Sequence, residues 1–306
     1  MNKKYLIIGI ILLIITFIFA HSPQKRLKKS TKANIAFQKL IPAREITHGH
    51  GLTVDIKDPK TLYIATHHGL YVLINDKDLY QLGDNNNDYM GFSPSVNNSK
   101  EFFASGHPEA GGNIGLQKSE DGGFSWKQIS DGLDGPVDFH SLSVSPKSPN
   151  LIFGWFKGKI QRSTDGGLNW EASYPTKFFA TSLIADTTNE NIVYATTPQG
   201  PGVMVSRDKG ESWSLLSGEL QGGIVSTLAI DPNDSQKLLV FSEKLGGLAK
   251  SSDGGKTWQK INELFNKEEI LYLAISRTDP NIVYALSHKN SIYKSVDSGE
   301  TWNKIR

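Results

Sequence analysis

One eight-residue phrase, Ser-x-Asp-x-Gly-x-x-Trp, occurs five times in the chain and constrains its fold more than any other feature. The copies run over Ser119–Trp126, Ser163–Trp170, Ser206–Trp213, Ser251–Trp258 and Ser295–Trp302. Their aspartates follow one another at intervals of 44, 43, 45 and 44 residues, and a degenerate sixth copy places Asp76 45 residues before the first of them. A fixed period of forty-odd residues is typical of propeller blades or of another repeat array. The sequence therefore contains six repeated units.

The residue types of the phrase suit a tight turn that packs against a neighbour. An Asp side chain accepts hydrogen bonds from nearby backbone amides, and Gly adopts the positive φ that such turns need. Trp buries a large ring and so anchors the turn. These properties explain why the phrase recurs once in each unit.

The phrase resembles the Asp-box, or BNR repeat, of bacterial sialidases, sortilin-type receptors, photosystem II assembly-factor propellers and many exported bacterial proteins. This resemblance implies that the boxes are folding devices on the periphery of the blades, away from any active centre. It gives a structural role to Asp121, Asp165, Asp208, Asp253 and Asp297. A calcium loop is the alternative, but an EF-hand needs a bidentate Glu at its twelfth position between flanking helices, and neither feature is present.

Short apolar-alternating segments, separated by Gly, Pro, Asn and Asp, surround each box and predict antiparallel strands. In the fifth unit the expected strands are Thr227–Ile230, Lys237–Phe241, Gly247–Ser251 and Thr257–Ile261. Four strands in each of six units, closed into a ring, predict an all-β fold. We expect a six-bladed β-propeller of four-stranded antiparallel blades over residues 35–306, with only short and protected sheet edges.

The segment Phe37–Leu40 resembles the outermost strands that follow the boxes, such as Trp126–Ile129 and Trp302–Ile305. It could close the ring against the last blade, although that blade already has its own outermost strand. Whether the segment adds a fifth strand or packs elsewhere stays open from the sequence.

Residues 1–20 indicate export. Lys3 and Lys4 precede an unbroken apolar run over Tyr5–Ala20, which is the layout of a secretory signal peptide. An uncleaved N-terminal membrane anchor is the alternative, since the run of 16 residues falls just short of the usual spanning minimum. Residues 21–34 carry five basic side chains. We interpret them as a solvated tether, with attraction to anionic lipid or wall polymer as the alternative.

Charge and cysteine content narrow the possible partners. The chain has no cysteine, so neither a disulfide nor a lipid-modified cysteine can contribute. Residues 1–32 hold seven basic and no acidic residues, which leaves 26 basic and 31 acidic residues in the remainder. A weakly acidic body without a basic stripe argues against nucleic acid as a partner. We expect an extracytoplasmic monomer, secreted or tethered, that meets the membrane only through its N-terminal segment.

The histidines fall on one face of the predicted ring. In an up-and-down blade, the boxes join the third strand to the fourth. They therefore lie opposite the connections that enter each first strand and those that join the second strand to the third. All seven histidines after the N-terminal segment occupy these opposite connections: His48, His50, His67, His68, His107, His140 and His288. The sequence thus predicts a pocket at the mouth of the central channel, on the face without boxes.

The predicted ligand-binding residues are His50, His68, Asp88, His107, Asp138, His140, Trp155, Glu243 and His288. Trp155, the only Trp outside the phrase, suits the rim of such a pocket, because aromatic rings beside polar groups suit sugars and other hydroxyl-rich ligands. Imidazoles beside carboxylates also suit a zinc-class divalent metal, with His48, His50 and His140 as candidate ligands. The alternative is that these histidines are solvated turn residues.

Three functions fit this pocket. The first, our principal hypothesis, is an exported propeller that binds a glycan, a cell-wall polymer or a protein without performing chemistry. The second is a glycoside hydrolase of non-sialidase type, which could use Asp88 and Asp138 as a carboxylate pair. The third is an extracytoplasmic assembly factor that holds a peptide, by analogy with the photosystem and sortilin-like propellers.

The resemblance to sialidases does not extend to their catalytic residues. Those enzymes clamp the substrate carboxylate with three arginines, and here only Arg44 is expected near the mouth. Arg162 and Arg207 lie beside or inside boxes, and Arg277 belongs to a turn on the same face as the boxes. Between the remaining hypotheses, two carboxyl groups facing each other across the mouth would favour a hydrolase. A histidine lining would favour binding or a metal.

Overall fold

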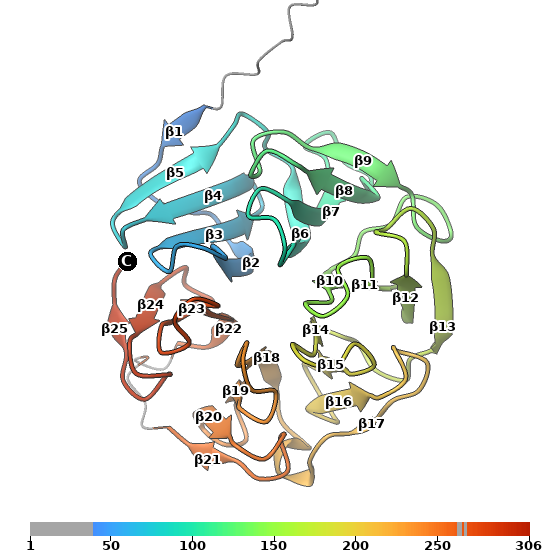
Figure 1. The fold of residues 1–306 in the computed structure, drawn as a ribbon, viewed down its shortest axis with the longest axis vertical. Coiled ribbons are helices and arrows are strands. Elements are labelled where there is room, and N and C mark those ends of the chain that lie inside the picture. Colours follow the sequence, from blue (N-terminus) through green and yellow to red (C-terminus); the bar gives the residue numbers. More distant parts are fainter. Residues whose placement is uncertain (1–38, 262–264, 266–267) are drawn as a thin grey trace, which may run out of the picture. The chain divides into compact units, whose positions relative to one another are not determined.

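The computed structural model describes residues 39–261, 265 and 268–306, which form a ring of six antiparallel sheets (Figure 1). Each sheet is one blade of consecutive strands, and the first of its four sequential strands lies nearest the centre. The predicted six-bladed β-propeller is therefore confirmed. Among the described residues, no helix has both the length and the apolar character needed to cross a membrane. The predicted export segment and tether, residues 1–34, lie outside the described part of the chain.

The strands follow one another blade by blade. Blade 1 contains β1 (Leu40–Pro42), β2 (Gly49–Val54), β3 (Thr61–Thr66), β4 (Gly69–Ile74) and β5 (Asp78–Leu82). Blade 2 contains β6 (Asp88–Pro94), β7 (Phe102–His107), β8 (Leu116–Ser119) and β9 (Lys127–Ser130). Blade 3 contains β10 (Ser141–Val144), β11 (Ile152–Phe156), β12 (Lys159–Ser163) and β13 (Glu171–Pro175).

The second half of the ring repeats this order. Blade 4 contains β14 (Ser182–Ala185), β15 (Val193–Thr196), β16 (Val203–Ser206) and β17 (Ser214–Leu215), followed by the 3-10 turn η2 (Gly218–Leu220). Blade 5 contains β18 (Val225–Ile230), β19 (Leu238–Ser242), β20 (Gly247–Ser251) and β21 (Gln259–Lys260). Blade 6 contains β22 (Ile270–Ile275), β23 (Val283–Ser287), β24 (Ile292–Ser295) and β25 (Asn303–Lys304).

The outermost strands of blades 5 and 6 are shorter than the sequence predicts. The strand expected over Thr257–Ile261 forms ladder pairs only at Gln259 and Lys260, both of which are exposed. By contrast, β18 extends the expected inner strand by two residues, to Val225. The difference follows burial, because inner strands pack between neighbouring blades and outer strands have solvent on one edge.

The N-terminal segment adds a fifth strand to the first blade. β1 pairs with β5 through the partners Leu40–Leu82, Ile41–Gln81 and Pro42–Tyr80. Blade 6 keeps its own four strands, so β1 does not close the ring against it. Phe37 and Gln38, the rest of the proposed clasp segment, lie outside the described residues.

The repeated phrase forms the same turn between the third and fourth strands of blades 2 to 6. In blade 3, the Ser163 hydroxyl donates to Asp165 Oδ1 at 2.8 Å and accepts from the Gly167 amide at 2.8 Å. The Asn169 amide donates to the same carboxylate at 2.9 Å, and Trp170 Nε1 donates to the Gly167 carbonyl at 3.0 Å. The other four copies repeat these four bonds. Each carboxylate is therefore occupied by its own turn.

The second glycine of the phrase also sets the distance between blades. Gly167 has φ +91°, and a Cβ atom placed there would overlap the buried Leu116 of blade 2 and press against Ile129 Cδ1 at 3.3 Å. The preceding position is less restricted. A Cβ on Gly166 meets only Asn150 Oδ1, at 3.7 Å, and the equivalent residues of blades 4 and 6 are Lys209 and Ser298. The turn thus connects local conformation to packing between blades.

Replacing the two glycines separately tests this coupling. We expect Gly166→Ala to lower the free energy of unfolding by about 1 kcal/mol, the cost of a left-handed backbone. Gly167→Ala should lower it by about 2–4 kcal/mol, because overpacking against Leu116 adds to that cost. Chemical denaturation of both variants measures the difference. Equal losses would show that the contact between blades carries no cost.

The hydrophobic core is divided among the interfaces between blades. Six clusters of buried side chains lie among the described residues, one at each interface, and each draws on two adjacent sheets. Between blades 1 and 2, for example, Ala65 and Leu70 pack with Tyr89 and Phe102. Burying apolar surface is the main stabilising term in such a fold. Every blade therefore depends on both of its neighbours.

The ring closes between blades 6 and 1 through side chains. Tyr284, which is fully buried, places its hydroxyl 2.7 Å from Asp76 Oδ1 and 3.0 Å from the Pro59 carbonyl oxygen. Lys294 Nζ donates to Asp76 Oδ2 at 2.6 Å. Asp76 occupies the position of the repeat aspartate in blade 1. Here its carboxylate binds the neighbouring blade, whereas each repeat aspartate binds its own turn.

Candidate functional site

The described histidines lie at one end of the sheets. Because successive strands are antiparallel, the start of a first strand and the end of a second strand meet at the same edge. His50 lies at the start of β2, and His48 and His140 immediately precede β2 and β10. His67 and His68 follow β3, His107 ends β7 and His288 follows β23. The repeat turns lie at the opposite edge, since they join third and fourth strands. We call the histidine-bearing end of the ring the channel mouth.

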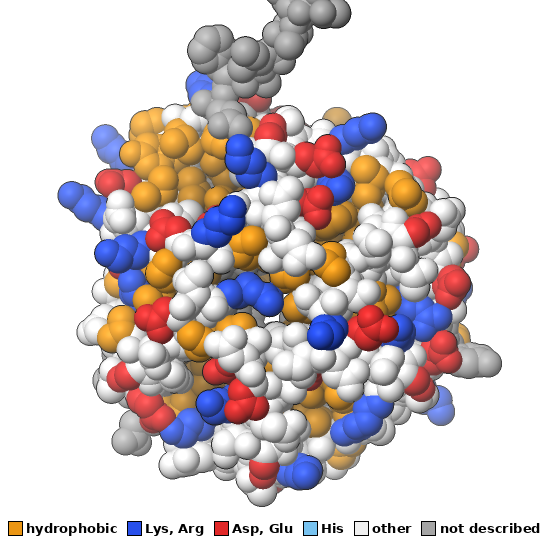
Figure 2. Space-filling model, in the orientation of Figure 1, with side chains coloured by type: hydrophobic (Ala, Val, Ile, Leu, Met, Phe, Trp, Pro, Cys, Tyr) orange, Lys and Arg blue, Asp and Glu red, His pale blue; other side chains and the backbone are white. Residues whose placement is uncertain are grey.

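The opposite side of the ring has a different surface. On the face turned to the viewer in Figure 2, lysine, arginine and acidic side chains are scattered with both signs intermixed. No histidine of the described residues is in view there. The imidazoles are therefore a local feature of the channel mouth.

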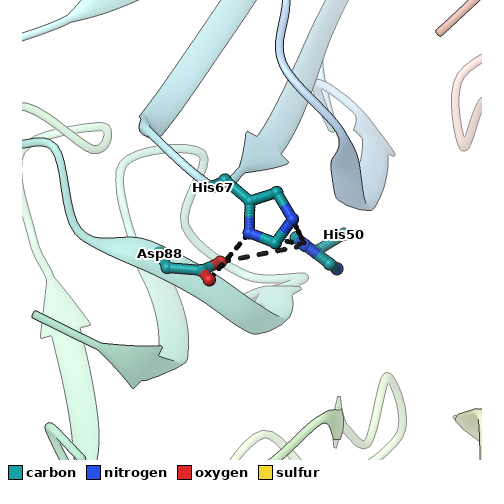
Figure 3. Close-up of side chains that lie close together, drawn as sticks. All are labelled: His50, His67 and Asp88. Carbon is teal, nitrogen blue, oxygen red and sulfur yellow. Dashed lines mark hydrogen bonds and ion pairs between the residues drawn. The ribbon is translucent and has the colours of Figure 1, made fainter. Parts of the chain in front are cut away.

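Three side chains from blades 1 and 2 form a first cluster, His50, His67 and Asp88 (Figure 3). His67 Nδ1 lies 2.7 Å from Asp88 Oδ2, and His50 Nε2 lies 3.2 Å from both ring nitrogens of His67. His50 Nε2 is also 3.8 Å from Asp88 Oδ1. His50 stands at a β-bulge between Gly49 and Gly51, and a bulge re-aims the side chain it carries. The first cluster is thus assembled by an irregularity in β2.

Burial keeps His50 neutral. Burial is the largest cause, the neighbouring His67 also lowers the pKa of this imidazole, and Asp88 opposes them, with a net pKa of about 4. Burial also lowers the pKa of His48, with His67 as the next cause. The His48 ring stacks on that of His67 at a centroid distance of 5.6 Å. A neutral imidazole has a lone pair available for a hydrogen-bond donor or for a metal ion.

A second cluster joins blades 2 and 3 through His107, Asp138 and His140. Asp138 Oδ2 lies 3.0 Å from His107 Nε2 and 2.5 Å from His140 Nε2. The Asp138 side chain is only 7% exposed, and its Oδ1 is buried without a hydrogen-bond partner among the described residues. The hydrogen bond to Asp138 raises the pKa of His140. Two imidazoles therefore converge on one buried carboxylate oxygen.

The two clusters repeat one arrangement in successive pairs of blades. In each, a histidine at the end of a second strand meets an aspartate at the start of the next blade: His67 with Asp88, and His107 with Asp138. The third histidine differs, because His50 comes from the blade of the first histidine and His140 from the blade of the aspartate. The His–Asp pair thus occurs at equivalent positions of successive blades, whereas the third histidine occupies a different position in each cluster.

The channel that the clusters border has a lining without charged groups. A cavity of about 230 Å³ runs between the innermost strands of all six blades, and His50 and His140 are the ionisable imidazoles that line it. Among the described residues, no Asp, Glu, Lys or Arg lines this cavity. Both aspartates of the clusters lie beside the channel, each engaged by histidine.

An aromatic pair stands next to the second cluster. Trp155 pairs across the ladder with Ser141, the residue after His140. Its ring meets that of Phe179 at a centroid distance of 4.4 Å, edge to face, and Phe179 is 48% exposed. Trp155 Nε1 donates to Thr176 Oγ1 at 3.2 Å. Trp155 is therefore half-buried, and the exposed ring beside it is Phe179, which the sequence did not predict as a site residue.

The remaining predicted residues lie outside both clusters. His68 is exposed and its Nδ1 is 3.3 Å from Thr47 Oγ1. His288 Nδ1 accepts a hydrogen bond from the Glu269 amide at 3.1 Å. Glu243 lines a separate hollow that Glu269 also borders. Five of the nine predicted ligand-binding residues thus lie in the two clusters: His50 and Asp88 in the first, and His107, Asp138 and His140 in the second.

The sequence did not predict His67 as a ligand-binding residue. The predicted metal ligands His48, His50 and His140 do not form one cluster. Aligning blades 1 and 2 on their bulges pairs Ala65 with Ser105 and so puts His67 level with His107, which is the signal that favours His67 over His68. His48, His50 and His140 do not converge on one point: His50 belongs to the first cluster and His140 to the second. The His48 ring contacts that of His50 at 5.0 Å.

Comparison with known proteins gives the class of protein as a β-propeller. Residues 246–306 match the family model described as sortilin, neurotensin receptor 3. The xyloglucanase Xgh74A of Acetivibrio thermocellus is 27% identical over 40% of this chain and 19% of its own length. A xyloglucanase of Hypocrea jecorina is 23% identical over 65% of this chain and 25% of its own length. The chain thus spans about a fifth to a quarter of the curated relatives that it matches.

Solved structures share the fold at low sequence identity. The GH74 xyloglucanase from Xanthomonas campestris superposes with a TM-score of 0.62 and 16% identity, over 87% of this chain and 46% of its own. YCF48 bound to D1 peptide superposes with a TM-score of 0.56 and 16% identity, over 87% of this chain and 84% of its own. The same fold therefore occurs in xyloglucanases and in a propeller that holds a peptide.

The lowered pKa of His50 predicts acid sensitivity. Between pH 6.5, its ordinary pKa, and about 4, the unfolded chain binds a proton that the folded chain does not, so stability falls as the pH falls through this window. His50 alone should contribute a loss of about 3 kcal/mol by pH 4. In His50→Gln the slope of unfolding free energy against pH should flatten, whereas His68→Gln should retain it. Equal slopes in wild type and His50→Gln would contradict the assignment.

Proposed function

We propose that this chain is an exported β-propeller that binds a ligand across the channel mouth, on the face opposite the repeat turns. Export rests on the signal-like layout of residues 1–20 and on the basic segment 21–34 that follows it. The ring would then lie on the outer side of the cell membrane, either free or held by the N-terminal segment. Its ligand is a glycan or cell-wall polymer in this proposal, and a peptide is the alternative.

The lining of the channel carries the proposal. Imidazoles reach the cavity, and the described lining contains no carboxylate. A glycoside hydrolase of the usual kind places two carboxyl groups on either side of the scissile bond, one of them free to act as an acid. Asp88 and Asp138 are instead each engaged by a histidine at 3.0 Å or less. This arrangement favours binding over hydrolysis.

The aromatic pair supports a glycan as the ligand. Trp155 and the exposed Phe179 provide an apolar surface beside the polar His140, and ligand sites typically combine such surfaces with a few placed polar groups. The matched xyloglucanases are named for a polysaccharide, which adds to the case for a glycan. The structure titled YCF48 bound to D1 peptide is the reason to keep a peptide as the second candidate.

A binding screen tests the ligand. The full chain is titrated with xyloglucan oligosaccharides, peptidoglycan fragments and a peptide library, and Kd is measured for each. We expect Trp155→Ala and His140→Ala to weaken glycan binding by at least about tenfold, or 1.4 kcal/mol, as for central contact residues of an interface. The control is Val296→Ala, which removes an exposed apolar side chain from the repeat turn of blade 6, away from the channel mouth.

The outcomes separate the candidates. Unchanged Kd values in both mouth variants would exclude the channel mouth as the binding site. Binding confined to peptides would favour the assembly-factor alternative. Release of new reducing ends from a bound glycan by the wild-type chain, lost in Asp88→Asn or Asp138→Asn, would favour the hydrolase.

Export has its own test. Cells producing the full chain are treated with an external protease, and we expect the ring to be digested while a cytoplasmic marker survives. Deleting the apolar run Tyr5–Ala20 should protect the protein. Protection of the undeleted chain in intact cells would contradict the proposed location.

A further inference from the structure

The second cluster has the composition and the geometry of a metal site. We infer that His107, Asp138 and His140 together bind a divalent ion of the zinc class at the channel mouth. The three ligand atoms are two imidazole nitrogens and one carboxylate oxygen, and all lie within 4.8 Å of one another. They come from two blades, since His107 ends β7 while Asp138 and His140 precede β10. The ion would therefore also bridge an interface between blades.

The orientation of His107 supports a cation. Its Nδ1 lies 2.7 Å from the Gly112 carbonyl oxygen, and a carbonyl can only accept, so Nδ1 carries the hydrogen. In the neutral ring, Nε2 then presents its lone pair toward Asp138 Oδ2, 3.0 Å away. Two acceptors at that distance need a proton or a metal ion between them. A backbone carbonyl that fixes the second nitrogen is also the usual support of a metal-bound histidine.

Asp138 adds an independent reason. A buried carboxylate is costly unless it is paired with a charge, hydrogen-bonded or bound to a metal. Among the described residues, the ion pairs of Asp138 are with His107 and His140 alone, and Oδ1 has no hydrogen-bond partner. While both imidazoles are neutral, the carboxylate keeps its negative charge and Oδ1 keeps its acceptor capacity, and a divalent cation would compensate the charge.

The ligand set indicates which ion fits. Tetrahedral zinc with ligands at about 2.0–2.1 Å separates the ligand atoms by about 3.3 Å. The nitrogen–oxygen distances of 3.0 and 2.5 Å would need to widen by less than about 1 Å. Imidazole suits zinc, nickel and copper, whereas calcium prefers six to eight oxygens. His107 and His140 are 37% and 42% exposed, so the fourth position would be open to water or to a ligand at the mouth.

The first cluster does not support the same inference. His50 Nε2 lies 3.2 Å from both ring nitrogens of His67, so these two rings face each other instead of a common point. No backbone carbonyl is among the hydrogen-bond partners that the described residues give the His67 ring. Both clusters offer three ligand atoms, but the carbonyl that orients His107 and the convergence of two imidazoles on Asp138 favour the second cluster.

Metal titration of the full chain tests the inference. The protein is purified without a polyhistidine tag, stripped with EDTA and titrated with ZnCl₂ by calorimetry, and CoCl₂ provides a visible spectrum that reports coordination. We expect one zinc site to weaken by about 100-fold or more in His107→Ala, His140→Ala and the isosteric Asp138→Asn. His68→Ala, which removes a histidine outside both clusters, should bind as the wild type does. Circular dichroism checks that each variant is folded.

Each result bears on the inference directly. It is overturned if the wild-type chain binds neither Zn²⁺ nor Co²⁺, or if all three cluster variants bind as the wild type does. It is also overturned if the site disappears in His50→Ala and survives in His140→Ala. No glycan or peptide is present in the titration, so a failed ligand screen and a failed metal titration are separate results.

Discussion

Packing between neighbouring blades is the constraint on which the rest of this structure depends. No blade has a core of its own, because the buried clusters of the described residues all lie between two sheets. The repeat turns stabilise the hairpins that contain them, and they also take part in the packing between blades. In blade 3, the turn places Gly167 against Leu116 of blade 2 and also carries Trp170, which packs in the interface cluster of those two blades. The aspartate carboxylates hold this geometry from within the turn, and bonds from the Asn169 amide and side chain hold the pKa of Asp165 at about 2.

The same ring geometry collects the functional side chains. Blades repeat around a central axis, so equivalent positions of successive blades lie side by side at the channel mouth. A histidine at the end of one second strand then meets an aspartate at the start of the next blade, as His67 meets Asp88 and His107 meets Asp138. A third histidine beside such a pair turns it into a cluster of three ionisable side chains. His50, which stands at a bulge, and His140, which precedes β10, are these third histidines, and both line the channel.

The sequence predicted the fold, and the end of the ring at which the histidines lie, better than it predicted the individual side-chain contacts. Period and box residues fix the number of blades, and strand order fixes the edge on which each histidine lies, because both depend only on topology. The choice between His67 and His68 depends on which way two adjacent side chains point, and the turn after β3 settles it. The burial of Asp138 and the exposure of Phe179 depend on packing between blades, which one sequence does not reveal. The short outermost strands have the same origin, since solvent on one edge leaves pairing weakly specified.

The seam between blades 6 and 1 has a consequence for the channel mouth. Among the described residues, no chain connection joins blade 6 to blade 1, and the contact between them includes an apolar cluster, the bonds that Tyr284 and Lys294 make with Asp76, and bonds from Asn290 and Arg306 to backbone carbonyls. The innermost strand on one side of this seam is β2, which carries His50, and His48 immediately precedes it. The positions of both imidazoles therefore depend on non-covalent contacts between blades 6 and 1. The Asp76 carboxylate thus helps to hold the histidine-bearing strand of blade 1 in place, although it lies at the far edge of the blade.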